Sequence, residues 1–594
     1  MGIIGWIHPA SDLRRDRATL NAMAHAGDVT PDGTGVIRLV ESAGFAYRGR
    51  TVGYADGRHP NRREPELIVV VDGRLHHRDQ LQSRLGRWPG PVVSDADLLL
   101  LAYRRWGVRL VEHIDGSYAI AVWDSVQHLL LLICDRIGAK AWYYRSDDGG
   151  GLLFATSVRG VLAHPGMTNV IDADGLNELL TLGPVRTPGH GVLRGVHELA
   201  PGHLVRAVPG RISTYQYGQW PADRHDHDLE GTAAVVRGVL ADATVPLRKQ
   251  PPGAVLLSGG IASAAAAAAF TSASTVDRPA AYILALAGPW SQPPHAGVDL
   301  TAARRTAAHL DLRSTMVTPD ADAVLDAGVA TRAVLDFPGE SATDAARLAL
   351  LRRVAADVSS VVTGDGAATV FGDHSWLHHL DLEAGDTFPW QRPGLSPADL
   401  LCADARLHLL PEAYVKFRYA EATRTIPDVI TDDAIGRAHR RAAHLTLTHC
   451  LPARLRRLDQ LAIAAGLVAH TPFAAWPLAR YLAGVPYPVR HLTTIRLGLL
   501  RHTVADLLPA SVTWLPSLPA PSADVLPAWR RSQHEQLHSL LSDRTQPLQP
   551  LLDRARITEL INQPARQRPR HWHTSIAYLL DVNAWLTRHH VTLT

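Results

Sequence analysis

The fold is decided by the stretch Val255-Leu256-Leu257-Ser258-Gly259-Gly260-Ile261-Ala262-Ser263, which leads into an alanine-rich segment that ends near Phe270. An apolar run, a glycine turn and then strong helix formers predict a strand, a turn and a helix. Glycines let backbone N–H groups approach an anion, and Ser258 and Ser263 add hydroxyl donors at the positive end of the helix. The pattern is typical of a nucleotide-phosphate site, and an ordinary glycine turn between a buried strand and helix is the alternative.

A second glycine turn follows another buried strand. Val358-Ser359-Ser360-Val361-Val362-Thr363 ends in Gly364-Asp365-Gly366, and the pattern between the two turns predicts strands at 280–288 and 314–317 and a helix at 299–310. Buried strands that alternate with helices imply an α/β doubly wound parallel sheet. Ligands of such a sheet bind beyond the carboxyl ends of its strands, so both turns are expected at one edge. The candidate nucleotide-binding residues are Ser258, Gly259, Gly260, Ser263, Gly364 and Gly366.

Residues 1–217 are predicted to form a separate, β-rich domain. The expected elements are strands at 67–71, 117–124 and 129–133, a turn at Asp72-Gly73 and a helix at 96–106. Strands on both sides of a helix in the chain favour an α+β layered sandwich.

The composition turns polar at residues 218–231, where histidine alternates with aspartate. Such a stretch is expected to be a solvated linker between domains, with opportunistic metal binding as the alternative. A second domain is then expected to span residues 232–594.

The 594-residue chain has a formal net charge of +3, from 60 lysines and arginines and 57 acidic residues. Without long basic blocks, this balance requires neither nucleic acid nor an anionic membrane as a partner. The three cysteines, Cys134, Cys402 and Cys450, lack zinc spacing and indicate a reducing compartment without disulfides. No apolar run is long enough to span a membrane and no signal peptide is recognised, so we expect a cytoplasmic protein.

Several segments of the first domain resemble the glutaminase-type domain of the asparagine synthetase superfamily. They are residues 95–107, 114–124 and 135–144, and Leu199-Ala200-Pro201-Gly202-His203 resembles the turn that closes that domain. The resemblance implies a glutaminase-like, Ntn-type sandwich.

The first domain departs from a working glutaminase at its nucleophile. Such enzymes carry a cysteine directly after the initiator methionine, and here that position is Gly2, with no cysteine before Cys134. Asp72 stands where the resemblance implies an asparagine. We therefore expect no glutamine hydrolysis and a structural role, with a share in binding a peptide as the alternative.

The second domain resembles the ATP pyrophosphatase domain of the same superfamily, an adenine nucleotide α-hydrolase-like fold. Residues 362–372 resemble its second nucleotide loop, and residues 471–486 and 499–509 resemble its helical C-terminal part. The resemblance implies that ATP, with Mg²⁺, turns a carboxylate into an acyl-adenylate for attack by an amine.

Two further segments resemble the lasso peptide macrolactam cyclase branch. Residues 578–586 resemble its C-terminal helix, and residues 373–380 replace the ordinary continuation of the second loop. This resemblance implies that an Asp or Glu side chain of a precursor peptide is adenylated and that the peptide's own N-terminal amine closes a macrolactam. The implied partners are the precursor peptide, a leader-binding protein and a leader peptidase.

The family's catalytic pattern is incomplete in this sequence. Ala262 and Ala368 stand where the resemblance implies the two aspartates that bind Mg²⁺, and alanine supplies no ligand oxygen. No lysine follows Lys416, so the lysine that stabilises charge on the α-phosphate is also missing. Arg496 or Arg501 could supply positive charge, although neither matches the family position.

Asp365 is the one catalytic candidate. It lies at the centre of the second loop, where the resemblance implies a glutamate or a tyrosine, and it could deprotonate the attacking amine or help to hold metal. Capping of the next helix is the alternative. His374 and His378 are four residues apart and could form a metal pair, but we leave them out of the predicted site.

Three functions therefore compete. The first is an ATP-dependent amide ligase of the lasso cyclase type with an altered metal site. The second is a non-catalytic relative that binds a peptide or a partner, and the third is an ammonia-dependent asparagine synthetase. The retained phosphate-cradle pattern favours the first.

Overall fold

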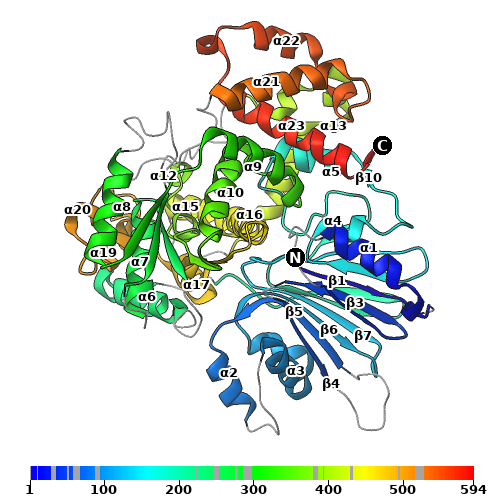
Figure 1. Cartoon of the computed structure of the whole chain (residues 1–594), viewed down its shortest axis with the longest axis horizontal. Helices are drawn as coiled ribbons and strands as arrows, with labels where there is room; N and C mark the ends of the chain where they lie inside the picture. Colours follow the sequence, from blue (N-terminus) through cyan, green and yellow to red (C-terminus); the bar gives the residue numbers. More distant parts are fainter. Residues whose placement is uncertain are drawn as a thin grey trace. The chain divides into compact units, whose positions relative to one another are not determined.

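The chain folds into two units, each with its own sheets (Figure 1). The first unit comprises Met1–Val170 and Pro188–Gln219, and the second comprises Ile171–Thr187 and Trp220–Thr594. The computed structural model describes residues 2–9, 11–27, 35–49, 52–57, 67–86, 94–221, 225–244, 253–273, 278–284, 297–378, 386–391, 394–427, 433–492, 495–515 and 527–594. The sequence predicted one continuous first domain over residues 1–217. In the structure, Ile171–Thr187 within that range belongs to the second unit.

The first unit is built on two six-stranded antiparallel sheets. One has the order β11-β8-β9-β1-β3-β2 and the other β13-β12-β7-β6-β5-β4. The strands of the first sheet are β1 (Gly2–Ile7), β2 (Val36–Leu39), β3 (Ala43–Arg48), β8 (Tyr143–Ser146), β9 (Leu152–Ala155) and β11 (His197–Glu198). Those of the second are β4 (Val52–Gly57), β5 (Leu67–Leu75), β6 (Gly116–Asp124), β7 (Leu129–Cys134), β12 (His203–Val208) and β13 (Arg211–Gln216).

Apolar side chains of both sheets share one core. Ile3 and Phe45 come from the first sheet, and Ile68, Val70 and Trp123 come from the second. A second cluster lies on the other face of β5 and β6, under the leucine-rich helix α3. The helices of this unit are α1 (Arg17–Gly27), α2 (Arg78–Leu85), α3 (Asp95–Trp106) and α4 (Val158–Leu162), with 3-10 turns at Leu13–Arg15 and Gly107–Glu112. The predicted sandwich is confirmed.

The turn predicted at Asp72-Gly73 is wrong. Strand β5 continues through both residues, with Asp72 opposite Ala119 and Gly73 opposite Tyr118 on β6. A Cβ atom at Gly73 would lie 2.0 Å from the carbonyl oxygen of Ser117, so this glycine permits a close approach of two strands. An Asp-Gly pair is typical of a turn, but a glycine is also needed where two strands lie too close together for a side chain.

The second unit contains a five-stranded parallel sheet in the order β16-β15-β14-β17-β18. Its strands are β14 (Ala254–Leu257), β15 (Ala280–Leu284), β16 (Arg313–Val317), β17 (Ser360–Val362) and β18 (Val468–His470). Figure 1 shows α6 (Leu229–Thr244) and α7 (Ile261–Ala273) on one side of this sheet, and α10 (Ser341–Ala355) and α16 (Leu451–Ala464) on the other. The predicted α/β architecture is confirmed, while residues 285–288 of the predicted second strand lie outside the described residues.

Helices account for most of the remaining second unit. They are α5 (Ala173–Asn177), α8 (Gly297–His309), α9 (Ala321–Val334), α11 (Ala367–Val370), α12 (Ser375–His378), α13 (Ala403–Leu409), α14 (Pro411–Thr423), α15 (Ala434–Leu445), α17 (Trp476–Gly484), α18 (Tyr487–His491), α19 (Gly498–Thr503), α20 (Ala510–Thr513), α21 (Pro527–Ser542), α22 (Arg554–Asn562) and α23 (Trp572–Arg588). Short helical turns lie at Glu178–Leu182, Pro397–Leu400, Thr446–Cys450, Pro472–Ala474, Gln549–Leu551 and Ala565–Gln567, and short strands at Val170–Ile171 (β10) and Thr592–Leu593 (β19).

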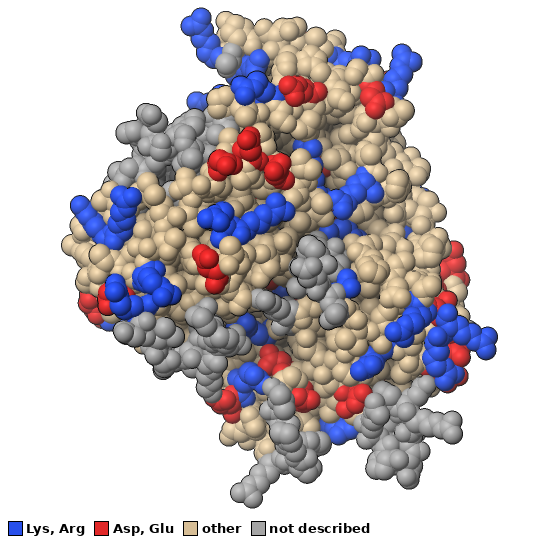
Figure 2. All heavy atoms as spheres, in the orientation of Figure 1, with Lys and Arg blue, Asp and Glu red and all other residues tan. Residues whose placement is uncertain are grey.

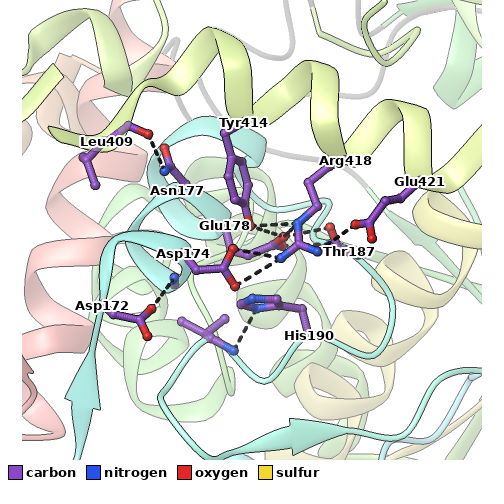
Figure 3. A network of polar contacts seen from close by, with 12 residues as sticks. Asp172, Asp174, Asn177, Glu178, Thr187, His190, Leu409, Tyr414, Arg418 and Glu421 are labelled. Atoms are coloured by element: carbon purple, nitrogen blue, oxygen red, sulfur yellow. Dashed lines mark hydrogen bonds and ion pairs between the residues drawn. The ribbon is translucent and has the colours of Figure 1, made fainter. Parts of the chain in front are cut away.

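A buried carboxylate holds the segment Ile171–Thr187 within the second unit. Glu178 is fully buried and accepts hydrogen bonds from the backbone N–H of Thr187 (2.9 Å), the hydroxyl of Thr187 (2.7 Å) and the hydroxyl of Tyr414 (2.8 Å). Arg418, on the same helix as Tyr414, lies 3.2 Å from Glu178 and 3.0 Å from Asp174 (Figure 3). A buried charge requires such partners, so the segment and α14 depend on one another.

The stretch predicted to be a solvated linker is exposed at residues 226–228, and it also makes contacts with the second unit. Trp220 meets Trp476 edge-on, with 4.9 Å between ring centroids, and His227 lies 2.9 Å from the hydroxyl of Tyr481. Helix α6 already begins at Leu229. Residues 222–224 lie outside the described residues.

Two surface properties complete the fold. Basic and acidic side chains are interspersed on the face shown in Figure 2. Across the ranges that the structure describes, none of the helices is long and apolar enough to cross a membrane.

Candidate functional site

Two glycine loops meet at the carboxyl ends of β14 and β17. The first glycine loop, residues 258–263, joins β14 to α7, and the second, residues 363–366, joins β17 to α11. A Cβ atom at Gly364 would lie 2.6 Å from the carbonyl carbon of Ala262 and 2.7 Å from the nitrogen of Ser263. Only a glycine allows this contact, so the backbone of the second loop rests directly on the start of α7.

The first glycine loop is closed by its own serine. The hydroxyl of Ser263 accepts from the backbone N–H of Ser258 (3.2 Å) and donates to the carbonyl of Gly260 (2.8 Å), while Gly259 has φ +85°. Ser263 is buried, whereas Ser258 is exposed. Ser263 therefore shapes the turn, and Ser258 is the serine whose side chain faces solvent.

The second glycine loop carries an ion pair. Asp365 lies 3.1 Å from Arg347 of α10, and its carboxylate also accepts from the hydroxyl of Thr363. Burial by itself would raise the pKa of Asp365, but Arg347 and the Thr363 hydrogen bond hold this pKa below its ordinary value. Gly366, with φ +89°, caps α11, and no side-chain cap is made there. The structure thus places Asp365 against a cation.

Further charges lie on the same side of α10 as Arg347. Arg457 of α16 donates to Glu340 (2.7 Å) and lies 3.8 Å from Asp344. Arg457 lowers the pKa of Glu340 to about 2, while burial raises the pKa of Asp344. The spacing of Glu340, Asp344 and Arg347 by four and three residues places them on one helical face, but it does not reveal that this face meets the second glycine loop.

The two glycine loops suit the phosphates of ATP, whereas the residues beside them lack the ligands that Mg²⁺ prefers. The first N–H groups of α7 have no acceptor within the helix, and a glycine-lined approach to them is what a phosphate requires. Ala262 and Ala368 are partly exposed beside the loops and offer no side-chain oxygen. The carboxylate of Asp365 is taken by Arg347, and that of Asp373 by Arg496. These described residues do not provide the oxygen set that Mg²⁺ prefers.

Neither arginine proposed as a substitute for the family lysine is free. Arg496 donates to both carboxylate oxygens of Asp373, at 3.1 Å and 3.3 Å. Arg501 is buried and donates to the carbonyl of Arg496 (2.7 Å) and to that of Thr513. Arg347, which was not among the residues predicted from the sequence, is a cation that lies against the second glycine loop.

The segments that resemble the cyclase branch have different surroundings. In residues 373–378, the rings of His374 and Trp376 stack at 4.2 Å, and Trp376 donates to the hydroxyl of Thr446 (3.2 Å). Residues 578–586 form the buried middle of α23, where Asp581 binds Arg332 of α9 (2.6 Å) and Ser341 of α10. The helix that carries Arg347 is therefore anchored on α23.

In the first unit, the position of the missing nucleophile is filled. A Cβ atom at Gly2 would lie 2.1 Å from the hydroxyl oxygen of Thr156 and 3.9 Å from a carboxylate oxygen of Asp72. Asp72 is buried and pairs with the buried Lys140 at 3.2 Å. The buried Cys134 donates to the carbonyl of Lys140 (3.2 Å).

Comparisons with known proteins cover both units. The family model described as asparagine synthase matches residues 235–587, and the glutamine amidotransferase domain model matches residues 1–218. The chain is 26% identical over 628 aligned residues to asparagine synthetase (glutamine-hydrolyzing) 3 of Bacillus subtilis strain 168, which covers 100% of this chain and 99% of that protein.

Two weaker similarities were also found. The chain is 26% identical over 345 residues to the amidase chry2 of Gibberella zeae, which covers 52% of this chain and 50% of that protein. A solved structure described as the allosteric regulatory enzyme of purine biosynthesis aligns at 9% identity and a TM-score of 0.28, covering 56% of this chain and 78% of that chain. That score is too low to support an argument.

Proposed function

Because the chain belongs to the asparagine synthase family, we propose that it is an ATP-dependent carbon–nitrogen ligase that activates a carboxylate as an acyl-adenylate. The observation that carries this proposal is the backbone contact between the two glycine loops at the carboxyl edge of the parallel sheet. Ligands of such sheets bind at this edge.

In this proposal, the described residues divide the work of holding ATP. The N–H groups at the start of α7 and the exposed hydroxyl of Ser258 bind phosphate oxygens, and Ser263 keeps the turn in shape. Arg347 and Asp365 are each about one third exposed, at 36% and 32% of their side chains. Arg347 can therefore exchange Asp365 for a phosphate oxygen and offset charge that develops during adenylation.

The finer proposal is that the substrate is a precursor peptide and the product a macrolactam, as in lasso peptide cyclases. An Asp or Glu carboxylate oxygen attacks the α-phosphorus of ATP and pyrophosphate leaves; the peptide's N-terminal amine then attacks the acyl carbon and AMP leaves. Residues 373–380 and 578–586, with their resemblance to that branch, support this substrate class. A leader-binding protein and a leader peptidase are the partners that this chemistry implies.

The ion pair between Asp365 and Arg347 sets a limit on the mechanism. Asp365 is our candidate to accept the proton of the amine, but its lowered pKa makes it a weak base while Arg347 is bound. The ion pair must therefore open before Asp365 can act.

We further propose that the first unit does not hydrolyse glutamine. This proposal is supported by Gly2, by its neighbour Thr156 and by the Asp72–Lys140 pair.

A non-catalytic relative that binds a peptide or partner is the second candidate. The missing side-chain oxygens at Ala262 and Ala368 favour it. An ammonia-dependent asparagine synthetase is the third candidate. The missing side-chain oxygens at Ala262 and Ala368 count against it as they count against the first candidate.

The full-length chain, ATP and MgCl₂ are incubated with a panel of peptides that carry a free N-terminal amine and an internal Asp or Glu. Ligation predicts loss of the mass of one water from a peptide and release of AMP in equal amount. A parallel reaction with aspartate and ammonium tests the third candidate. Peptide binding without ATP binding or AMP release would overturn the ligase proposal in favour of the second candidate.

Three variants sharpen this test. Gly364→Ala inserts a methyl group between the loops and is expected to abolish ATP binding, whereas Gly238→Ala, where a Cβ atom meets open space within α6, is the matched control. Ala262→Asp/Ala368→Asp restores two carboxylates beside the loops. If only the restored chain binds ATP in the presence of Mg²⁺, the second candidate is favoured.

A further inference from the structure

A compact cluster of ligand-type side chains lies outside the glycine loops, directly after α11. Asp373, His378 and His491 each offer one ligand atom, and these three atoms all lie within 4.8 Å of one another. Asp373 and His491 are buried and His378 is partly buried. The cluster joins the segment that follows the second loop to α18, although His491 is far away in the sequence.

Hydrogen bonds orient both histidines of the cluster. The Nδ1 atom of His378 lies 2.9 Å from the hydroxyl of Tyr487, and the Nε2 atom of His491 lies 2.8 Å from the carbonyl of Gly372. A backbone carbonyl can only accept, so His491 carries its proton on Nε2. Its Nδ1 atom is buried and has no hydrogen-bond partner among the residues that the structure describes.

This arrangement resembles the surroundings of metal-binding histidines. Such histidines donate one ring N–H to a carbonyl, carboxylate or water, which fixes the tautomer and leaves the other nitrogen for the metal. The Nδ1 atom of His491 is left in that state, and the Nε2 atom of His378 lies 3.2 Å from a carboxylate oxygen of Asp373. A buried polar atom without a partner is costly, and an ion would remove that cost.

We propose that Asp373, His378 and His491 bind a transition-metal ion of the Zn²⁺ class, which ties the segment after the second glycine loop to α18. Two imidazoles and one carboxylate suit Zn²⁺ and its neighbours, whereas Mg²⁺ prefers oxygen ligands. This site is separate from the two glycine loops and does not depend on the proposed ligase activity.

Arg496 competes with the ion for Asp373. It donates to both carboxylate oxygens, so metal binding must displace it from at least one of them. The side chain of Arg496 is 47% exposed, which leaves it free to move into solvent. In this proposal, Arg496 neutralises Asp373 whenever the ion is absent.

The test uses the full-length chain, stripped with a chelator and titrated with ZnCl₂ alone by calorimetry, with bound metal counted by mass spectrometry. One ion should bind per chain, and His378→Gln should weaken binding at least about tenfold. His374→Gln is the matched control, because His374 lies in the same segment, contacts the hydroxyl of Thr369 and does not belong to the cluster. Thermal unfolding of each variant checks that it remains folded.

Two further variants separate a designed site from adventitious binding. Tyr487→Phe removes the hydroxyl that orients His378 and should cost about 10-fold to 100-fold in affinity. Arg496→Gln removes the competing cation and should strengthen binding. Equal affinity in wild type, His378→Gln and Arg496→Gln, or a Co²⁺ spectrum with thiolate charge-transfer bands, would overturn the proposal.

Discussion

Each unit places an aspartate–cation pair at its candidate site, and the two pairs differ in their access to water. Asp72 and Lys140 in the first unit are 3.2 Å apart, and their side chains are 4% and 8% exposed. Asp365 and Arg347 in the second unit are 3.1 Å apart, but their side chains are 32% and 36% exposed. At nearly equal separation, the first pair is closed to any ligand and the second can exchange its partner.

Solvent decides what each pair can contribute. A buried pair has lost its hydration, so removing one partner leaves an uncompensated charge. A pair that is about one third exposed is partly screened by water and contributes less to stability, so its partner can be replaced at a smaller cost. The first pair is therefore suited to stabilise the fold, whereas the second is suited to exchange its partner for a ligand.

The largest expected effect comes from opening the closed pair. Lys140→Met leaves Asp72 buried without its cation and should destabilise the first unit by about 3–5 kcal/mol. Urea unfolding measures this loss. Lys416→Met, at an exposed lysine on α14, is the matched control and should change stability by less than about 0.5 kcal/mol. A loss below about 1 kcal/mol for Lys140→Met would contradict the comparison.

The comparison also predicts how stability depends on pH, through His449, a buried histidine that lacks an opposite charge in the described part of the chain. Burial, together with His444, lowers the pKa of His449 to about 3. The unfolded chain therefore takes up a proton near pH 6.5 that the folded chain refuses, so stability is complete above pH 6.5 and falls as the pH drops toward 3. At pH 5 the loss from this residue is about 2 kcal/mol.

His449→Gln should flatten that pH dependence. Unfolding midpoints measured between pH 7 and pH 5 should shift less in this variant than in wild type, and His538→Gln, at an exposed histidine, should behave like wild type. Parallel pH profiles for wild type and His449→Gln would mean that the imidazole is already solvated.

Breaking the open pair should change binding more than stability. Arg347→Met is expected to cost less than about 1 kcal/mol in unfolding free energy, because the pair is about one third exposed and partly screened by water. It should weaken ATP binding about tenfold, as measured by calorimetry, because a cation that offsets phosphate charge is lost. Arg352→Met, at an exposed arginine on the same helix, controls for general charge. Unchanged ATP affinity would remove Arg347 from the site.

The smallest effect is expected from restoring the nucleophile. In Gly2→Cys the new Cβ atom meets the hydroxyl of Thr156, and Asp72 remains paired with Lys140. Glutamate release from glutamine should therefore stay at background, also in Gly2→Cys/Asp72→Asn. Clear hydrolysis by the single variant would show that the first unit lost only one residue.

Local patterns predicted the framework of the second unit well. The run before Ser258 and the run before Gly364 became β14 and β17, because buried parallel strands and glycine turns leave strong local signals. Arg347 and His491 could not be found in this way. Their roles depend on α10 and α18 folding back on the glycine loops and on Gly372, and no local spacing encodes that return.

An error arose where a glycine had a tertiary purpose. Gly73 was predicted to lie in a turn, but it lets β5 approach β6 within the sheet. The partner of Gly73 lies on another strand, so the local pattern could not show why a glycine is needed there. Ser263 holds the first turn through the carbonyl of Gly260, and its contact with phosphate stays a prediction.

The path of the chain between the units restricts which gene deletions can remove the first unit without damage to the second. The chain passes from one unit to the other after Val170, after Thr187 and after Gln219, and the middle visit supplies Glu178 to Tyr414 and Arg418. A gene deletion that removed the first unit as one block would take Glu178 with it. Loss of the first unit as one block would thus also leave Arg418 of the second unit without its buried carboxylate partner, which is a reason to retain the first unit whatever its own activity.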